Sequence, residues 1–191
     1  MPALAEAFLA GGARFLQVRA KLSSSAVFLQ LSEEVVSRAH KAGAIIVVND
    51  RADVAKVAGA DGVHLGQDDL EPGEARRILG GAALIGWSTH SLEQVRAACR
   101  LPIDYVAVGP IFGTATKTTG YDAVGTELVS RARAVLSEAG LDTPIVAIGG
   151  ITLERAAAVI RAGASSVAVI SDLLSTGDPE ARVREYLAVL S

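Results

Sequence analysis

Two cations and an amide lie together near the start of the chain, in the segment Gln17-Val18-Arg19-Ala20-Lys21. Alternate residues of a strand point to one face, so Gln17, Arg19 and Lys21 would share a face and leave the aliphatic residues on the other. Cations inside a protein are costly without a partner. The pattern therefore predicts a bound anion, with an internal ion pair to an aspartate as the alternative for one of the two cations.

Carboxylates follow the next two apolar segments, the first ending in Asn49-Asp50 and the second leading to Asp69. No cysteine or histidine cluster accompanies them, and oxygen ligands completed by substrate phosphates are typical of magnesium. Asp69 has an alternative role as the N-cap of the next helix, and Asp50 has one as the partner of Arg19 or Arg51. Together with the cations, the pattern favours Asp50 and Asp69 as magnesium ligands.

Hydroxyl groups and a histidine follow another apolar segment, Leu84 to Thr89. Ser88 close to His90 suggests nucleophilic catalysis, but the Gly-x-Ser-x-Gly elbow of hydrolases is absent. The hydroxyl of Ser88 is therefore expected to bind a ligand, while His90 is equally suited to cap the helix that starts near Ser91. His64, in the middle of a strand, is expected to be a buried histidine with satisfied hydrogen bonds.

A long segment rich in glycine and threonine runs from Gly109 to about Gly125. Loops of this length inside a barrel are usually functional, and a merely solvated loop would not require Lys117. Two later segments end in Gly149-Gly150 and Ile170-Ser171, where backbone N–H groups can approach an anion closely. They predict a second phosphate site, distinct from the cationic one.

Short aliphatic runs separated by helical segments recur along the whole chain, which indicates an α/β fold with a parallel sheet. Helix starts are marked by Ser91, with Gln94 three residues later, and by Asp178 before Pro179. The expected strands are Arg14–Arg19, Ile45–Asn49, Gly62–Leu65, Leu84–Thr89, Tyr105–Ile111, Pro144–Gly150 and Ser166–Ser171.

A Gly-Ala pair precedes four of these strands, with its glycine at position 12, 43, 59 or 163. Glycine there supplies the left-handed end of a helix. An open dinucleotide-binding sheet would carry Gly-x-Gly-x-x-Gly after its first strand, and that fingerprint is absent. A closed (β/α)8 barrel is therefore predicted rather than an open sheet. No linker divides the chain, so the prediction is a single domain spanning residues 1–191.

Seven strands are one fewer than such a barrel contains. Met1 to Gly11 resembles the end of a helix, so the absent strand would be the first. Arg14–Arg19 and Ser166–Ser171 would then face each other across a gap of about two strand spacings, with unpaired edges prone to association. We expect either a natural gene product that starts upstream, or a seam that is open or filled by a partner, for example in a homo-oligomer.

Composition narrows the class of protein. The chain is 50% hydrophobic with a net charge of −3, so it lacks the basic surface of nucleic-acid-binding proteins. Its apolar runs are too short to span a bilayer, and no secretory signal opens it. The single cysteine, Cys99, lies in an apolar helical segment and is expected to be a structural thiol. These features favour a cytoplasmic protein without membrane or nucleic-acid partners.

With these residues assembled, the sequence resembles the thiamine-phosphate synthase family over essentially its whole length. The matching stretches are Gln17-Val18-Arg19-Ala20-Lys21, Val48-Asn49-Asp50-Arg51, Gly59 to Asp69, Trp87-Ser88-Thr89-His90, Gly109 to Lys117, Ile148-Gly149-Gly150-Ile151 and Val169-Ile170-Ser171. Ala20 departs from the family pattern, in which an acidic residue is frequent. The start of the chain also departs, because family members open with another strand.

The resemblance implies a role for each matching residue. Those implied to hold the aminopyrimidine diphosphate are Gln17, Arg19, Lys21, Asn49, Ser88 and Lys117. Those implied to hold the thiazole phosphate are Thr114, Thr116, Gly150, Ile170 and Ser171. Asp50 and Asp69 match the ligands of Mg2+.

The resemblance also implies a reaction, in which diphosphate leaves the pyrimidine methylene and the thiazole nitrogen attacks the resulting cation to give thiamine phosphate. Arg19, Lys21, Lys117 and magnesium would stabilise charge on the leaving group. A thiazole tautomerase of the same family is one alternative, with His90 as general base. A non-catalytic binder of thiamine precursors is another. The asparagine, the two aspartates and Lys117 favour the synthase.

Overall fold

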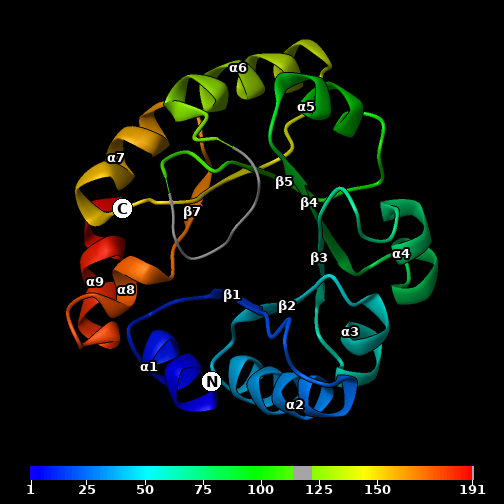
Figure 1. Ribbon diagram of the computed structural model, residues 1–191, viewed down its shortest axis with the longest axis vertical. Helices are drawn as coiled ribbons and strands as arrows, with labels where there is room; N and C mark the ends of the chain where they lie inside the picture. Colours follow the sequence, from blue (N-terminus) through cyan, green and yellow to red (C-terminus); the bar gives the residue numbers. More distant parts are fainter. Residues whose placement is uncertain (114–121, 191) are drawn as a thin grey trace.

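The computed structural model describes residues 1–113 and 122–190, which form a curled parallel sheet surrounded by helices (Figure 1). The seven strands pair in chain order, each parallel to the next, and thereby confirm the predicted α/β fold. They are β1 (Phe15–Val18), β2 (Ile45–Asn49), β3 (Gly62–Leu65), β4 (Leu84–Thr89), β5 (Tyr105–Val108), β6 (Ile145–Ile148) and β7 (Ser166–Ala168).

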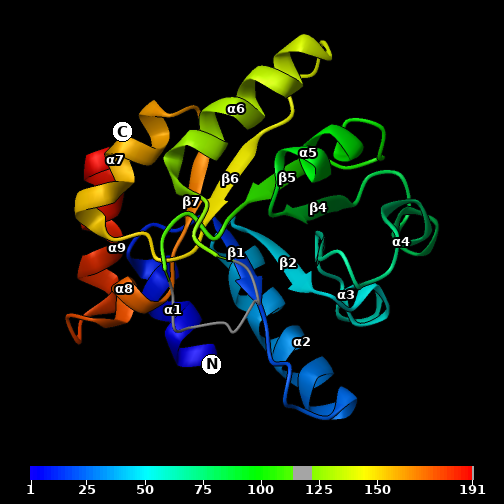
Figure 2. The same ribbon diagram turned by 45° about the horizontal axis from the view of Figure 1, so that its top comes forward.

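Among the described residues, one helix lies between each pair of successive strands, one precedes β1 and two follow β7, and together they cover the outer face of the sheet (Figures 1 and 2). They are α1 (Pro2–Ala10), α2 (Ser25–Lys41), α3 (Ala52–Ala58), α4 (Pro72–Leu79), α5 (Leu92–Ala98), α6 (Gly125–Glu138), α7 (Leu153–Arg161), α8 (Ser171–Leu174) and α9 (Pro179–Leu190). No helix formed by residues 1–113 or 122–190 has both the length and the apolar character needed to cross a membrane.

The alternation of side chains along β2 and β3 divides the core into two sides. Ile46 and Val63 belong to the apolar cluster shared with the helices. Val47, Asn49 and His64 alternate with them and are also buried, although they face the inside of the curl. Burial on both faces explains why these strands read as continuous apolar runs that end in polar residues.

The sheet does not close on itself. β1 and β7 are its two edges, and within the described residues neither has a second neighbour, as the strand count predicts. The helix layer continues across this side, because Gly11 at the end of α1 lies directly against α9. A Cβ atom on Gly11 would be 2.6 Å from the carbonyl oxygen of Glu180, so this contact requires glycine.

The Gly-Ala pairs have the expected backbone conformation. Gly12, Gly43, Gly59 and Gly163 all have positive φ, between 66° and 110°, which glycine adopts at low cost. They end α1, α2, α3 and α7 and direct the chain into the following strand. The repeat is therefore a structural feature of the helix-to-strand turns.

The predicted helix starts are also confirmed. The backbone N–H of Gln94 donates to the Ser91 hydroxyl at 3.2 Å, and the N–H of Ala181 donates to the Asp178 carboxylate at 3.0 Å. The side chain of Gln94 reaches one residue further than in a capping box, accepting a hydrogen bond from the N–H of His90 at 2.6 Å.

Several strands are shorter than predicted. β1 ends at Val18, so strand alternation does not extend to Arg19 and Lys21, which lie in the following turn. β5 ends at Val108, before Gly109 and Pro110, since proline has no N–H to continue the ladder. β7 ends at Ala168. The predicted polar ends of these strands are therefore loop residues or, for Ser171, the first residue of a helix.

Candidate active site

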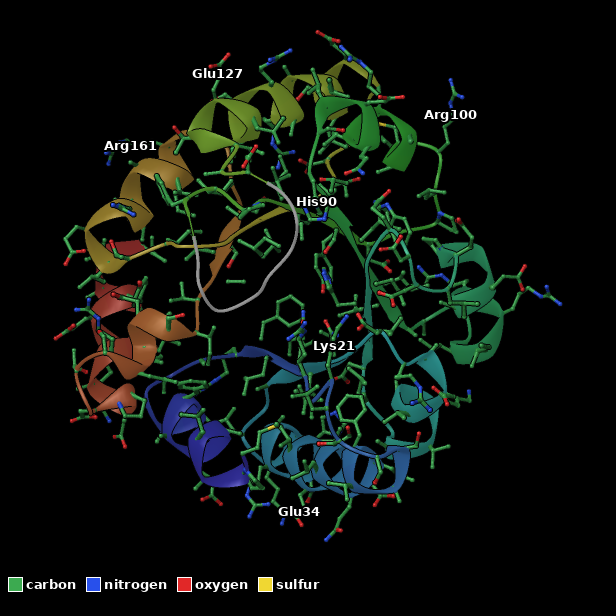
Figure 3. All side chains as sticks on the ribbon, in the orientation of Figure 1. Lys21, Glu34, His90, Arg100, Glu127 and Arg161 are labelled. Carbon is green, nitrogen blue, oxygen red and sulfur yellow. The ribbon has the colours of Figure 1, made fainter. Side chains whose placement is uncertain are left out.

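The carboxyl ends of β1 and β2 bring a lysine and an aspartate together. Lys21 Nζ lies 2.8 Å from Asp50 Oδ2. Figure 3 shows Lys21 toward the middle of the ring, whereas Glu34, Arg100 and Arg161 lie at its periphery. The predicted ion pair of one cation with an aspartate is thus present. Arg19 forms no salt bridge with any residue that the structure describes.

The backbone at Asp50 is unusual and fixes the position of its carboxylate. Asp50 has φ of 64°, the only positive value at a non-glycine residue in the described chain. Its N–H donates to the carbonyl of His64 on β3 at 2.8 Å, which holds the turn against the neighbouring strand. Conformations of this kind in residues other than glycine cost energy and cluster at functional sites.

Asp69 lies in the turn after β3, and its carboxylate closes that turn. Its Oδ2 accepts the N–H of Gly66 at 2.8 Å. The N-cap position of α4 belongs to Glu71, so the alternative role of Asp69 as a helix cap is wrong. The carboxyl groups of Asp69 and Asp50 lie close enough for each to shift the pKa of the other.

The pKa values of the two carboxyl groups are shifted in opposite directions from the ordinary value of aspartate. Burial by itself would raise the pKa of Asp50, but hydrogen bonds from Lys21 and Asp69 and the charge of Arg19 outweigh it and lower that pKa. Burial raises the pKa of Asp69, and the nearby Asp50 carboxylate adds to the increase. Two crowded carboxylates with one lysine therefore form a site that an added cation would relieve.

The donor set fits a hard divalent cation. Asp50 and Asp69 offer only oxygen atoms, and the described residues contain no group of three histidine, cysteine or acidic side chains that could hold a metal without help. The other proposed partner of Asp50, Arg51, binds Asp53 instead. Two carboxylates, with the remaining positions left for water and phosphate oxygens, is the arrangement that Mg2+ favours.

Polar side chains continue the site along the inner face of β2, β3 and β4. Asn49 and Ser88 are buried, and the hydroxyl of Ser88 lies 2.8 Å from Nε2 of His64. Nδ1 of His64 lies 2.9 Å from the hydroxyl of Tyr105 on β5. His64 is thus the satisfied buried histidine that its mid-strand position predicts. The sequence interpretation did not include Tyr105, because a tyrosine that opens an apolar strand carries no motif.

Gln67 is a second residue of the site that the sequence pattern did not indicate. Its side-chain N–H donates to the backbone carbonyl of Ser88 at 2.6 Å, which links the turn after β3 to the end of β4. Its place in the Gly66 to Asp69 turn was the available signal. Gln67 fixes the backbone that carries the Ser88 hydroxyl.

His90 directly follows β4, and Figure 3 shows it toward the middle of the ring, inside the helix layer. Its Nδ1 lies 2.5 Å from the carbonyl oxygen of Gly109, so Nδ1 is the protonated donor. The ring borders a hollow of about 270 Å3 whose other lining residues are Val124, Glu127, Leu128 and Arg131. His90 is therefore oriented by the loop after β5, and Ser91 rather than His90 caps α5.

The loops after β5 and β6 approach each other closely at Gly150. This residue has φ of 61°, and a Cβ atom on it would lie 2.5 Å from the carbonyl oxygen of Gly113. The neighbouring Gly149 also has positive φ, 93°. Only glycine satisfies both the conformation and the space, as the paired-glycine motif suggests.

The loop after β7 is fastened to two helices by Asp172, which sequence reasoning did not single out. Its Oδ2 accepts hydrogen bonds from the Leu153 N–H, from Arg182 and from the Tyr186 hydroxyl, at 2.7 to 3.2 Å. Asp172 directly follows Ile170 and Ser171, so these bonds fix the start of α8 against α7 and α9.

The predicted site residues are thus distributed over several places in the fold. Lys21, Asp50 and Asp69 form one cluster, and Asn49 and Ser88 lie on the inner face of the adjoining strands. Gln17 is exposed on β1, Gly150 lies in the loop after β6, and Ile170 and Ser171 form the N-cap and first residue of α8 after β7. Thr114, Thr116 and Lys117 lie outside the described residues.

Comparison with known proteins adds a family to this geometry. Residues 1–173 match the model of a family described as thiamine monophosphate synthase. The chain is 41% identical over 183 residues to a thiamine-phosphate synthase of Chlorobium luteolum, covering 96% of this chain and 84% of that protein. It is 44% identical over 186 residues to one of Koribacter versatilis, covering 97% and 84%.

A solved structure shows the same likeness in three dimensions. It is a thiamine phosphate pyrophosphorylase from Pyrococcus furiosus, which superimposes with a TM-score of 0.89 at 28% sequence identity. The match covers 99% of this chain and 88% of that one.

Proposed function

This chain belongs to the thiamine monophosphate synthase family, and from that membership we propose how its residues carry out the reaction. It is a transferase of the thiamine-phosphate synthase type. We propose that it joins 4-amino-2-methyl-5-hydroxymethylpyrimidine diphosphate to 4-methyl-5-hydroxyethylthiazole phosphate, releasing diphosphate.

The observation that carries this proposal is the cluster of Lys21, Asp50 and Asp69 at the carboxyl ends of neighbouring strands. A diphosphate needs cationic partners and a divalent metal to leave a carbon atom easily. Lys21 would bind a diphosphate oxygen, while the two carboxylates would hold Mg2+. Magnesium bound there would supply positive charge to the leaving group.

The rest of the pyrimidine half surrounds this cluster. We assign Gln17, Arg19, Asn49, Ser88 and Lys117 to the pyrimidine diphosphate, with the three cations Arg19, Lys21 and Lys117 offsetting charge that develops on diphosphate. The C–O bond of the pyrimidine methylene breaks first, and its electron pair leaves with the diphosphate. The ring amino group stabilises the cation that remains, and the thiazole nitrogen then forms the new C–N bond. No side-chain nucleophile takes part.

The thiazole half would lie at the loops after β5, β6 and β7. Gly150, Ile170 and Ser171 would offer backbone N–H groups or a hydroxyl to the phosphate, and Thr114 and Thr116 would add hydroxyls. Close approach of the loops at Gly150 and the clamp at Asp172 support this assignment, because a phosphate site needs prepositioned donors.

The decisive experiment follows diphosphate release from the protein with both substrates and Mg2+. We expect release only when all three are present, and its loss on chelation of the metal. Turnover of thiazole isomers without metal would instead identify a tautomerase. Binding of both substrates without reaction would identify a non-catalytic binder.

A further inference from the structure

A chain of three buried polar side chains crosses the inside of the curl, from β5 through β3 to β4. The Tyr105 hydroxyl lies 2.9 Å from His64 Nδ1, and His64 Nε2 lies 2.8 Å from the Ser88 hydroxyl. All three residues are at least nine-tenths buried, with exposed fractions of 7%, 7% and 4%. Tyr105 and His64 have no role in the reaction proposed above.

Tyr105 is held rigidly at the inner end of this chain. Its ring covers Gly86, where a Cβ atom would lie 2.0 Å from the ring carbon that bears the hydroxyl. Phe15 packs edge-on against it, with centroids 5.5 Å apart, and the His64 ring stacks beside it at 5.6 Å. The hydroxyl therefore cannot turn to another partner.

The direction of the hydrogen bonds follows from the tyrosine. Burial, with a contribution from the charge of Asp104, raises the pKa of Tyr105, so its phenol stays protonated. Within the described chain its only hydrogen-bond partner is His64 Nδ1, and a buried O–H that fails to donate is costly. Nδ1 must then be the acceptor, and the neutral imidazole carries its proton on Nε2.

The same reasoning sets the role of Ser88. With its proton on Nε2, His64 donates to the oxygen of Ser88, so the Ser88 hydrogen is directed elsewhere. Gln67 holds the backbone carbonyl of Ser88, which fixes the place of this hydroxyl at the end of β4.

We propose that Tyr105 and His64 are positioning residues that make Ser88 an obligatory hydrogen-bond donor to the pyrimidine-diphosphate substrate. The partner must be an acceptor, either a ring nitrogen of the pyrimidine or an oxygen of the diphosphate. This inference rests on the proposed function for the identity of the ligand, but the direction of the hydrogen bonds does not.

The tautomer of His64 can be measured without any substrate. Correlation of imidazole nitrogens with ring protons by NMR distinguishes a protonated from an unprotonated nitrogen. We expect protonated Nε2 and unprotonated Nδ1 at neutral pH in the wild-type protein. His64→Gln identifies the resonances, and His40→Gln, which removes an exposed histidine at the opposite end of the sheet, is the matched control. A proton on Nδ1 overturns the proposal, whether or not the protein makes thiamine phosphate.

A double-mutant cycle tests whether Tyr105 acts through Ser88. Tyr105→Phe should raise KM for the pyrimidine diphosphate about tenfold, the order expected for one lost hydrogen bond, while KM for the thiazole phosphate stays unchanged. In a Ser88→Ala background, Tyr105→Phe should add nothing. Equal effects in the two backgrounds would show that Tyr105 contributes only packing. Phe15→Leu, which alters packing around the ring but keeps the hydroxyl, is the control and should leave KM unchanged.

Two competitive ligands locate the acceptor. If Ser88 donates to the diphosphate, Tyr105→Phe weakens inhibition by inorganic diphosphate. If it donates to the ring, the variant weakens inhibition by the pyrimidine alcohol, which lacks phosphate. Unchanged inhibition by both ligands would overturn the proposal.

Discussion

The two ends of the strand layer use polar residues in opposite ways. At the amino end, the residue that precedes every second strand accepts the backbone N–H of a neighbouring strand. Asp61 binds the N–H of Ile46 at 2.8 Å, Asp104 that of Ile85 at 2.7 Å, and Ser165 that of Ile145 at 3.2 Å. These contacts join β2 to β3, β4 to β5 and β6 to β7.

The amino-end groups are engaged further by neighbouring side chains. Asp61 contacts His40 at 3.1 Å, Asp104 pairs with Arg76 at 2.7 Å, and the hydroxyl of Ser165 accepts from Arg133 at 3.3 Å. At the carboxyl end, Asp50 and Asp69 are crowded and have pKa values shifted in opposite directions, and Asp50 has a left-handed backbone. The amino end is arranged for stability, and the carboxyl end holds groups whose charge a ligand would balance.

The largest effect should come from the carboxyl end. Asp50→Asn keeps a residue that tolerates positive φ but removes the charge. We expect the rate of diphosphate release to fall about 10²- to 10³-fold, the scale of losing a main electrostatic contribution, with the melting temperature nearly unchanged. Asp53→Asn is the control, because it alters an exposed carboxylate three residues away that binds Arg51. Wild-type activity of Asp50→Asn at low magnesium would refute the metal assignment.

A substitution at the amino end should lower stability and leave activity unchanged. Asp104→Ala leaves the fully buried N–H of Ile85 without its acceptor, which should lower the free energy of unfolding by about 1–3 kcal/mol. Urea unfolding measures this loss, while kcat of the folded protein should stay at the wild-type value. Asp104→Asn retains an acceptor oxygen and should lose less. A large fall in kcat with unchanged stability would remove the distinction between the two ends.

Gly150 sharpens the comparison within the carboxyl end. Gly150→Ala combines a left-handed backbone with the close approach to Gly113, so we expect KM for the thiazole phosphate to rise about tenfold, corresponding to about 1.4 kcal/mol. Gly177→Ala is the matched control, because Gly177 has φ of 78° but open space around it. The control should lose only the small amount of stability that the left-handed backbone costs, without any change in KM. Equal KM values for the two variants would place the thiazole phosphate elsewhere.

The smallest expected effect concerns Asp172, which forms a structural cluster with Arg182 and Tyr186 at the carboxyl end of the strands. Burial opposes ionisation of Asp172, but hydrogen bonds from Tyr186 and Arg182 outweigh it and lower its pKa below the ordinary value of 3.8. A lowered pKa stabilises the folded state above the ordinary value, and this contribution is lost as the pH falls through the folded-state pKa.

Melting curves from pH 7 down to pH 3 test this linkage. The wild type should melt a few degrees above Asp172→Asn at neutral pH, and the difference should shrink as the pH falls below about 4. Glu185→Gln, which changes another partner of Arg182 on the surface, should differ little from the wild type at any pH. A difference that grows toward acid pH would contradict the sign of the shift.

Much of the site could be predicted because its residues lie beside regular strands. Asn49-Asp50 and the Gly66 to Asp69 turn follow consecutive strands, and consecutive strands are neighbours in this sheet. The period-two alternation of side chains was a poorer guide to the residues after β1. It placed Arg19 and Lys21 on a strand that ends at Val18, because apolar periodicity does not reveal where a ladder stops pairing.

Local sequence by itself determined the seven strands, the glycines that end the helices and the two carboxylates after neighbouring strands, since periodicity and backbone conformation are properties of short segments. Tertiary structure alone decided that Lys21 pairs with Asp50, that Asp172 joins three helices, and that Tyr105 meets Ser88 through His64. These partners are up to 41 residues apart in the chain. Their contacts depend on the curvature and register of the sheet, which only the packing of the whole molecule fixes.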